Sequence, residues 1–183
     1  MVVLYQATLE ATPAFYARLG LNGTTGAVVP PCYPDFIFVY PPNATEQQQQ
    51  QHTVVVVDAK GSRAVTTGHR VQVALYTRLM SALLENAQLD SVLRVAPVGG
   101  VWLRDMPDYT RFELAHPSLL VDAALAGAAR DASSPLADLP WECDYHCAHC
   151  PFLSFCEQYA ADVEDTASIK STQGKVLDAL RLV

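Results

Sequence analysis

The chain is short of positive charge and has no long hydrophobic run. Its 183 residues include 12 lysines and arginines against 19 aspartates and glutamates, which gives a formal net charge of −7 at pH 7. A chain with this charge is not expected to bind nucleic acid through a broad basic surface. No apolar stretch approaches the roughly 20 residues that a transmembrane helix requires, so we expect no membrane span.

The first residues, Met-Val-Val-Leu-Tyr-Gln, lack the basic region and the cleavage site of a secretory signal. We therefore expect an intracellular protein, cytoplasmic or nuclear, in a reducing compartment. Half of the residues are hydrophobic and the mean hydropathy is +0.12, so a substantial core can form. The length predicts one domain, or one domain with a small appendage.

Two segments rich in Val, Ile, Phe and Tyr predict a pair of strands. Phe36–Tyr40 and Thr53–Val57 are separated by turn-like and polar residues, which indicates a hairpin. Asp35 precedes the first segment, and Asp58-Ala59-Lys60 follows the second. The two segments therefore place two acids and a lysine at the ends of neighbouring strands.

On a strand, Asp58 and Lys60 point to the same side because they are two residues apart. An ionised aspartate at the end of a buried strand is costly unless a cation compensates it. Lys60 alone can supply that cation in an ordinary salt bridge. The second carboxylate, Asp35, favours a divalent ion instead, because Mg²⁺ and Mn²⁺ prefer oxygen ligands such as two carboxylates and the Ala59 carbonyl.

A helix is predicted from about His69 to Gln88, after two turn-forming segments. Its apolar residues fall near helical spacing; they are Val71, Ala74, Leu75, Leu79, Leu83 and Leu84. Gln72 and Tyr76 are four residues apart and lie on one face of this helix. Their amide and phenol groups can donate hydrogen bonds to a phosphate or to a metal-bound carboxylate.

The ordered set Pro-Asp, 22 residues, Asp-x-Lys, 11 residues, Gln-x-x-x-Tyr resembles the PD-(D/E)XK nucleases. The Gln-x-x-x-Tyr helix is similar to that of their RecB-like branch. A lone Asp-x-Lys occurs often by chance, whereas the ordered set is far more specific. The resemblance implies an α/β fold with a restriction-endonuclease-like core, a mixed central sheet flanked by helices and a C-terminal cysteine-cluster appendage. It implies catalytic roles for Asp35, Asp58, Lys60, Gln72 and Tyr76, and Mg²⁺ or Mn²⁺ bound by Asp35, Asp58 and Ala59.

In relatives of this kind, a helix before the first strand often carries another acid or histidine of the metal site. The first predicted strand here is Val2–Leu9, close to the start of the chain, so that helix is expected to be absent. Thr12–Leu19 is compatible with a short helix or a loop. Pro41–Gln51, with its five glutamines, is expected at a hairpin tip.

Further strands and a helix are predicted after residue 90. Ser91–Pro97 and Val101–Arg104 are predicted strands flanking a hairpin turn at Gly99-Gly100. Phe112–Leu114 is a third short strand, and Pro117–Asp131 is a helix. Candidates for contacts with a nucleic-acid backbone are Arg104, Arg111 and Arg130.

Four of the five cysteines lie within 14 residues, at Cys143, Cys147, Cys150 and Cys156. In a reducing compartment, clustered thiols more often bind zinc or an iron–sulphur cluster than form disulfides. His146 and His149 lie among them and permit a Cys/His zinc site instead.

RecB-like nucleases of the AddB kind and CRISPR-associated exonucleases carry a C-terminal Cys-x-x-Cys-x5-Cys that holds a [4Fe–4S] cluster. Cys147, Cys150 and Cys156 resemble that motif in spacing. Cys143 is the first candidate for the fourth ligand and Cys32 the second. The resemblance implies a [4Fe–4S] cluster with a structural role, and Zn²⁺ is the alternative.

The predicted organisation is a nuclease core at 1–132, a cysteine segment at 133–160, and a linker with the start of a further element at 161–183. The resemblance implies a DNA exonuclease acting on single strands or ends in repair or replication. It also implies a helicase domain or subunit as partner. The alternatives are a catalytically inactive nucleic-acid-binding module and a zinc-ribbon interaction domain.

Overall fold

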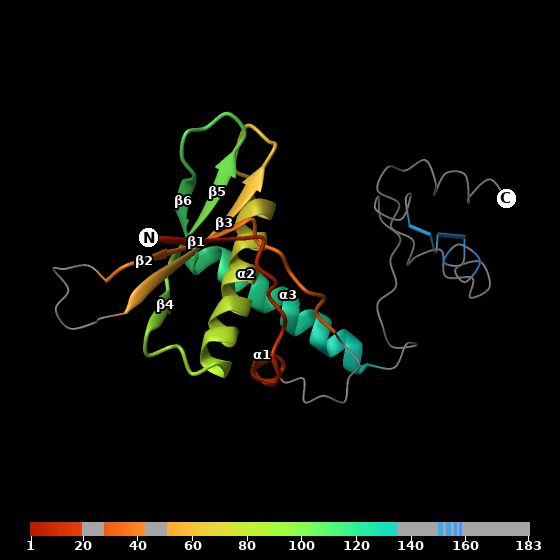
Figure 1. Cartoon of the computed structure of the whole chain (residues 1–183). Helices are drawn as coiled ribbons and strands as arrows, with labels where there is room; N and C mark the ends of the chain where they lie inside the picture. Colours follow the sequence, from red (N-terminus) through yellow and green to blue (C-terminus); the bar gives the residue numbers. More distant parts are fainter. Residues whose placement is uncertain are drawn as a thin grey trace. The chain divides into compact units, whose positions relative to one another are not determined.

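The computed structural model of the chain describes residues 1–19, 28–42 and 51–134, together with single positions at 150, 151, 153, 154, 156 and 158. The chain divides into two compact units, Met1–Ser133 and Ser134–Val183. All the helices and strands named below belong to the first unit (Figure 1). The predicted hairpin tip and most of the predicted cysteine segment lie outside the described residues.

Among the described residues, six strands form one mixed open sheet. They are β1 (Val2–Tyr5), β2 (Phe36–Tyr40), β3 (His52–Lys60), β4 (Leu93–Val95), β5 (Val98–Leu103) and β6 (Thr110–Glu113). The main order is β1-β2-β3-β5-β6. The first three strands are antiparallel neighbours, β4 and β5 both run parallel to β3, and β6 returns antiparallel to β5.

Three helices accompany the sheet: α1 (Pro13–Arg18), α2 (Thr67–Asn86) and α3 (Ala115–Ser133). Parallel pairing of β3 with β5 requires a long crossover connection, and α2 provides it. In the part of the chain that the structure describes, no helix is long and apolar enough to cross a membrane.

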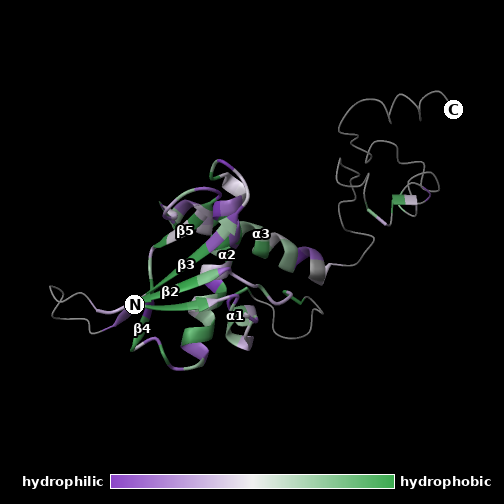
Figure 2. Ribbon diagram, turned by 45° about the horizontal axis from the view of Figure 1, so that its top comes forward, coloured by the Kyte–Doolittle hydropathy of each residue, from purple (hydrophilic) through white to green (hydrophobic). Residues whose placement is uncertain are grey.

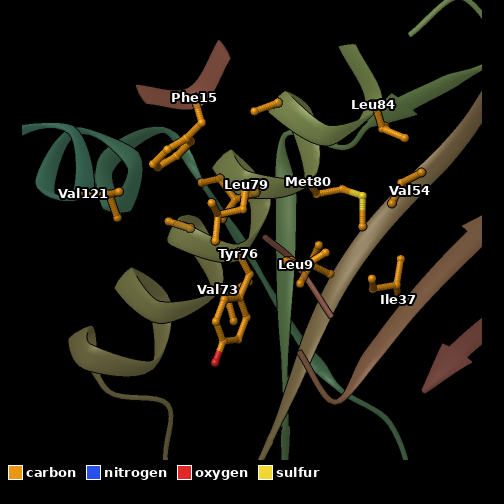
Figure 3. Close-up of a cluster of buried hydrophobic side chains, with 14 of the residues drawn as sticks. Leu9, Phe15, Ile37, Val54, Val73, Tyr76, Leu79, Met80, Leu84 and Val121 are labelled. Carbon is orange, nitrogen blue, oxygen red and sulfur yellow. The ribbon is translucent and has the colours of Figure 1, made fainter. Parts of the chain in front are cut away.

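The main hydrophobic core lies between one face of the sheet and the three helices (Figure 3). Phe15 of α1, Leu79 of α2 and Val121 of α3 meet Ile37 and Val54 from the central strands in this cluster. β2 and β3 are hydrophobic along most of their length (Figure 2). Because Val54–Val57 is buried throughout, β3 packs on both faces, as its unbroken valine run predicts.

The predicted strand Phe36–Tyr40 is confirmed, as is its antiparallel pairing with the following strand. Two lengths differ from expectation. The second strand of the pair extends to Lys60, and the first strand of the chain ends at Tyr5, where Gln6 adopts a positive φ of 47°. Thr12–Leu19, which the sequence left as either a short helix or a loop, contains the helix α1, beginning at Pro13. The Thr12 side chain caps this helix by accepting a hydrogen bond from the Phe15 N–H.

The expected hairpin turn at Gly99-Gly100 is wrong, because both glycines lie inside β5. A Cβ on Gly99 would lie 2.5 Å from Val73 of α2, and a Cβ on Gly100 would lie 2.8 Å from Val57 of β3. The glycines therefore permit close packing on both faces of the sheet. The interruption between the two strands, which the sequence predicted at this glycine pair, occurs earlier: β4 ends at Val95 and β5 begins at Val98.

Candidate active site

Asp35 and Asp58 lie opposite each other on neighbouring strands. The register pairs Phe36 with Val57 in antiparallel strands. Because Asp35 precedes Phe36 and Asp58 follows Val57, the two aspartates face each other. Asp35 Oδ2 accepts a hydrogen bond of 2.7 Å from the Ala59 N–H. Asp58 is 3% exposed, whereas Asp35 is partly open to solvent. Strand pairing therefore holds two carboxylates together, one buried and one accessible.

Lys60 completes this group from the same strand as Asp58. Its ammonium forms an ion pair with Asp58 Oδ2, as the two-residue spacing predicts. In the part of the chain that the structure describes, that buried oxygen has no hydrogen-bond partner beyond this ion pair. Burial raises the pKa of Asp58, the Lys60 ammonium lowers it, and the Asp35 charge raises it again. The carboxylate pair thus has more negative charge than one lysine offsets.

This donor set fits a hard divalent ion. Mg²⁺ is usually held by one or two carboxylates, with water and substrate phosphate completing its shell. Asp35 and Asp58 supply the two carboxylates, and the poorly satisfied Asp58 oxygen is the kind of atom that a cation stabilises. Within the described ranges, no group of three or more His, Cys, Asp or Glu residues is placed to bind a metal. Ala59 contacts Asp35 through its N–H, whereas its carbonyl was the predicted ligand.

Gln72 and Tyr76 lie one turn apart on α2. Gln72 Nε2 donates a 2.6 Å hydrogen bond to the Tyr76 hydroxyl. The Tyr76 ring packs in the core, while its hydroxyl points away from the rest of the cluster (Figure 3). Burial raises the pKa of Tyr76, the Gln72 hydrogen bond lowers it, and the nearby charge of Asp58 raises it further. The polar end of this pair is therefore within electrostatic reach of the Asp58 carboxylate.

Cys32 also lies near this site. Its backbone pairs with Leu9, and burial raises the pKa of its thiol. Its charge, when ionised, raises the pKa of Tyr76. Cys32 is three residues before Asp35 in the sequence, and it was the second candidate for the fourth ligand of the cysteine cluster.

A shallow hollow of about 420 Å³, which was not predicted, lies next to Lys60 at the end of β3. It is lined by Phe36, Ala59, Lys60, Gly61, Trp102, Leu103 and Arg104. Trp102 lines this hollow because β5 pairs with β3 in a register that sets Trp102 beside Ala59. No local pattern in the sequence specifies that register, so the spacing of motifs did not point to Trp102.

The predicted cysteine cluster is not tested by the structure. Cys143 and Cys147 lie outside the described residues. Cys150 and Cys156 are described, and both, like Cys32, are free thiols. The ligand set therefore stays a prediction from spacing.

Comparison with known proteins found no similarity: no protein-family model, no curated protein and no solved structure matches this chain.

Proposed function

We propose that the chain is a metal-dependent nuclease that hydrolyses phosphodiester bonds in DNA, acting on single strands or ends. The observation that carries the proposal is the Asp35–Asp58–Lys60 group, with two facing carboxylates and a lysine in contact with the buried one. The strand order supports it: β1, β2 and β3 form an antiparallel meander, which the resemblance to the PD-(D/E)XK nucleases implies for the core.

Each side chain has a role that its surroundings support. Asp35, oriented by the Ala59 N–H, and Asp58 would bind Mg²⁺ or Mn²⁺ through their carboxylate oxygens. Such an ion, when bound, lowers the pKa of its water and offsets charge on the phosphate. Lys60, whose side chain is 25% exposed, can reach a phosphate oxygen or orient the attacking water. Gln72 and Tyr76 would donate hydrogen bonds to the phosphate or to Asp58.

The test is cleavage of a labelled single-stranded oligonucleotide with Mg²⁺ or Mn²⁺. We expect Asp58→Ala and Lys60→Ala each to lower the rate at least about 100-fold, because each removes a group that acts on the reacting phosphate. Asp131→Asn, which changes an exposed acid near the end of α3, is the matched control and should leave cleavage unchanged. Circular dichroism of each variant establishes that the fold persists. Full activity in both site variants would contradict the assignment.

We further propose that Cys143, Cys147, Cys150 and Cys156 hold a [4Fe–4S] cluster, with Zn²⁺ as the alternative, and that a helicase domain or subunit is the partner. The spacing of the cysteines supports the first proposal. The net charge of −7 supports the second proposal. A chain with this charge has little general attraction for DNA, so a partner that also binds DNA would raise its affinity.

A further inference from the structure

The sheet has a second face, to which none of the described helices contributes core residues. Its buried cluster contains Phe38, Val55, Val57, Ala96 and Tyr109, with Phe36, Tyr40, Val98 and Trp102 packed against it. Aromatic rings dominate this face. Phe36, Phe38 and Tyr40 alternate along β2, and consecutive rings stack at 6.0 and 6.2 Å between centroids. We call this surface the aromatic face.

One end of the aromatic face lies at the end of β3, which carries Asp58 and Lys60; these two side chains extend from the side of the strand opposite to Ala59. The hollow described above lies there, and Lys60 both lines it and pairs with Asp58. The Phe36 and Trp102 rings meet at 5.6 Å between centroids and form one wall. The Trp102 indole N–H donates a 2.9 Å hydrogen bond to the Met106 carbonyl, which fixes the ring. Beside it, Gly61 has no side chain, and a Cβ there would meet no atom of the described residues within 4 Å.

At the other end, Tyr40, Arg94 and Arg111 are among the residues that line a second hollow of about 340 Å³. The Arg111 guanidinium lies over the Tyr109 ring, 5.2 Å from its centroid. Lysine and arginine side chains therefore border both ends of the aromatic face. The acids near it include Asp105, 3.6 Å from Arg104, Asp108, whose Oδ1 accepts a hydrogen bond from the Tyr109 N–H, and Glu113, which pairs with Val98.

We propose that the aromatic face binds single-stranded nucleic acid. Its bases would stack on Phe36 and Trp102, its phosphates would contact Arg104 and Arg111, and the strand would enter the active site past Gly61. The choice of occupant rests on the proposed function. Its physical basis is that stacking rings with flanking cations match an unpaired strand, which presents bases and phosphates in turn. In a chain of net charge −7, arginines at both ends of the aromatic face supply the local complementarity that the strand requires.

The binding test uses the full chain with a fluorescein-labelled oligo(dT) of about 12 nucleotides, in EDTA so that no cleavage occurs. Trp102→Ala should weaken binding roughly 5- to 150-fold, the range found when one stacking ring is removed. Trp102→Phe keeps a ring and should restore most of the affinity. Because a Trp102 variant also changes packing, thermal unfolding of each variant accompanies the titration.

Gly61→Leu tests the same surface without removing a contact. The new side chain enters open space, so the fold should persist while the hollow is filled and binding weakens. Gly127→Leu on α3 is the matched control, because the one described atom that a Cβ there would meet within 4 Å belongs to the Arg130 guanidinium, at 3.9 Å. It should bind as the unchanged protein does.

Three results would overturn the proposal: no binding of oligo(dT) by the unchanged chain, binding insensitive to both Trp102→Ala and Gly61→Leu, or a dimer in solution that Trp102→Ala converts to a monomer. The last would make the face an interface between two copies. Failure of the proposed function has a different signature. If no metal supports cleavage while binding follows the expected order of variants, the nuclease proposal fails and the aromatic face stands as a binding surface.

Discussion

Gly100 occupies a position where any side chain meets two neighbours on the aromatic face. A Cβ there would lie 2.8 Å from Val57 and would also strike the Tyr109 ring, and neither can retreat easily inside a packed layer. We expect Gly100→Ala to lower the free energy of unfolding by about 1–3 kcal/mol in a urea titration. Gly61→Ala is the control and should change it by less than about 0.5 kcal/mol. Equal stability of the two variants would contradict this account of the packing.

Tyr109 links stability to alkaline pH. Burial, followed by the hydrogen bond with Tyr40, raises the pKa of Tyr109 from 10.0 to about 12, and Arg111 lowers it. The folded state holds this proton more tightly than the unfolded state, so the contribution is complete below about pH 10 and is lost as the pH rises towards about 12.

We therefore expect the free energy of unfolding to fall between about pH 9 and about pH 11. Tyr109→Phe should make this fall smaller, by on the order of 2 kcal/mol at most. Urea titrations at the two pH values measure it. Tyr33→Phe, which changes an exposed tyrosine, should leave the pH dependence as it is. An unchanged slope in Tyr109→Phe would show that this phenol does not contribute.

At the scale of elements, α2 matters most, because it carries Gln72 and Tyr76 and joins β3 to the parallel strands. Its start is defined by a reciprocal cap: Thr66 Oγ1 accepts from the His69 N–H at 3.3 Å, and the Thr66 N–H donates to His69 Nδ1 at 3.2 Å. The helix begins at Thr67, two residues before the start that the turn signals predicted. The cap thus specifies the boundary that apolar spacing left approximate.

Thr66→Ala should destabilise the protein by about 0.5–2 kcal/mol, because the first turn of α2 loses the acceptor for one of its unpaired N–H groups. Thermal unfolding followed by circular dichroism measures the change. Thr66→Ser keeps the hydroxyl and should retain most of the stability. Serine and alanine variants of equal stability would show that the hydroxyl does not cap this helix.

At the scale of the whole molecule, the testable question is which metal the cysteines hold. Anaerobic purification should give a brown protein with a broad absorption band near ~400 nm and about four irons per chain. Cys147→Ser should abolish the colour. If Cys143 is the fourth ligand, Cys143→Ser should do the same and Cys32→Ser should retain the colour. One zinc and no colour would contradict the iron–sulphur proposal and favour the zinc alternative.

Local patterns in the sequence determined a large part of the first unit, Met1–Ser133. Alternation along a strand requires Asp58 and Lys60 to share a side, and helical spacing requires Gln72 and Tyr76 to share a face; both follow from backbone geometry within a few residues. The same kind of signal predicted β2 and the antiparallel pair that it makes with β3. The two glycines in β5 were misassigned because a Gly-Gly pair is also a local signal for a turn.

Only the tertiary structure decided which of these groups meet. Register places Asp35 opposite Asp58, packing of α2 on the sheet brings Tyr76 within reach of that carboxylate, and the parallel pairing of β5 with β3 sets Trp102 beside Ala59. These contacts join residues at least 18 positions apart. They depend on the burial of whole faces and on close approaches such as those at Gly99 and Gly100, which no window of neighbouring residues contains.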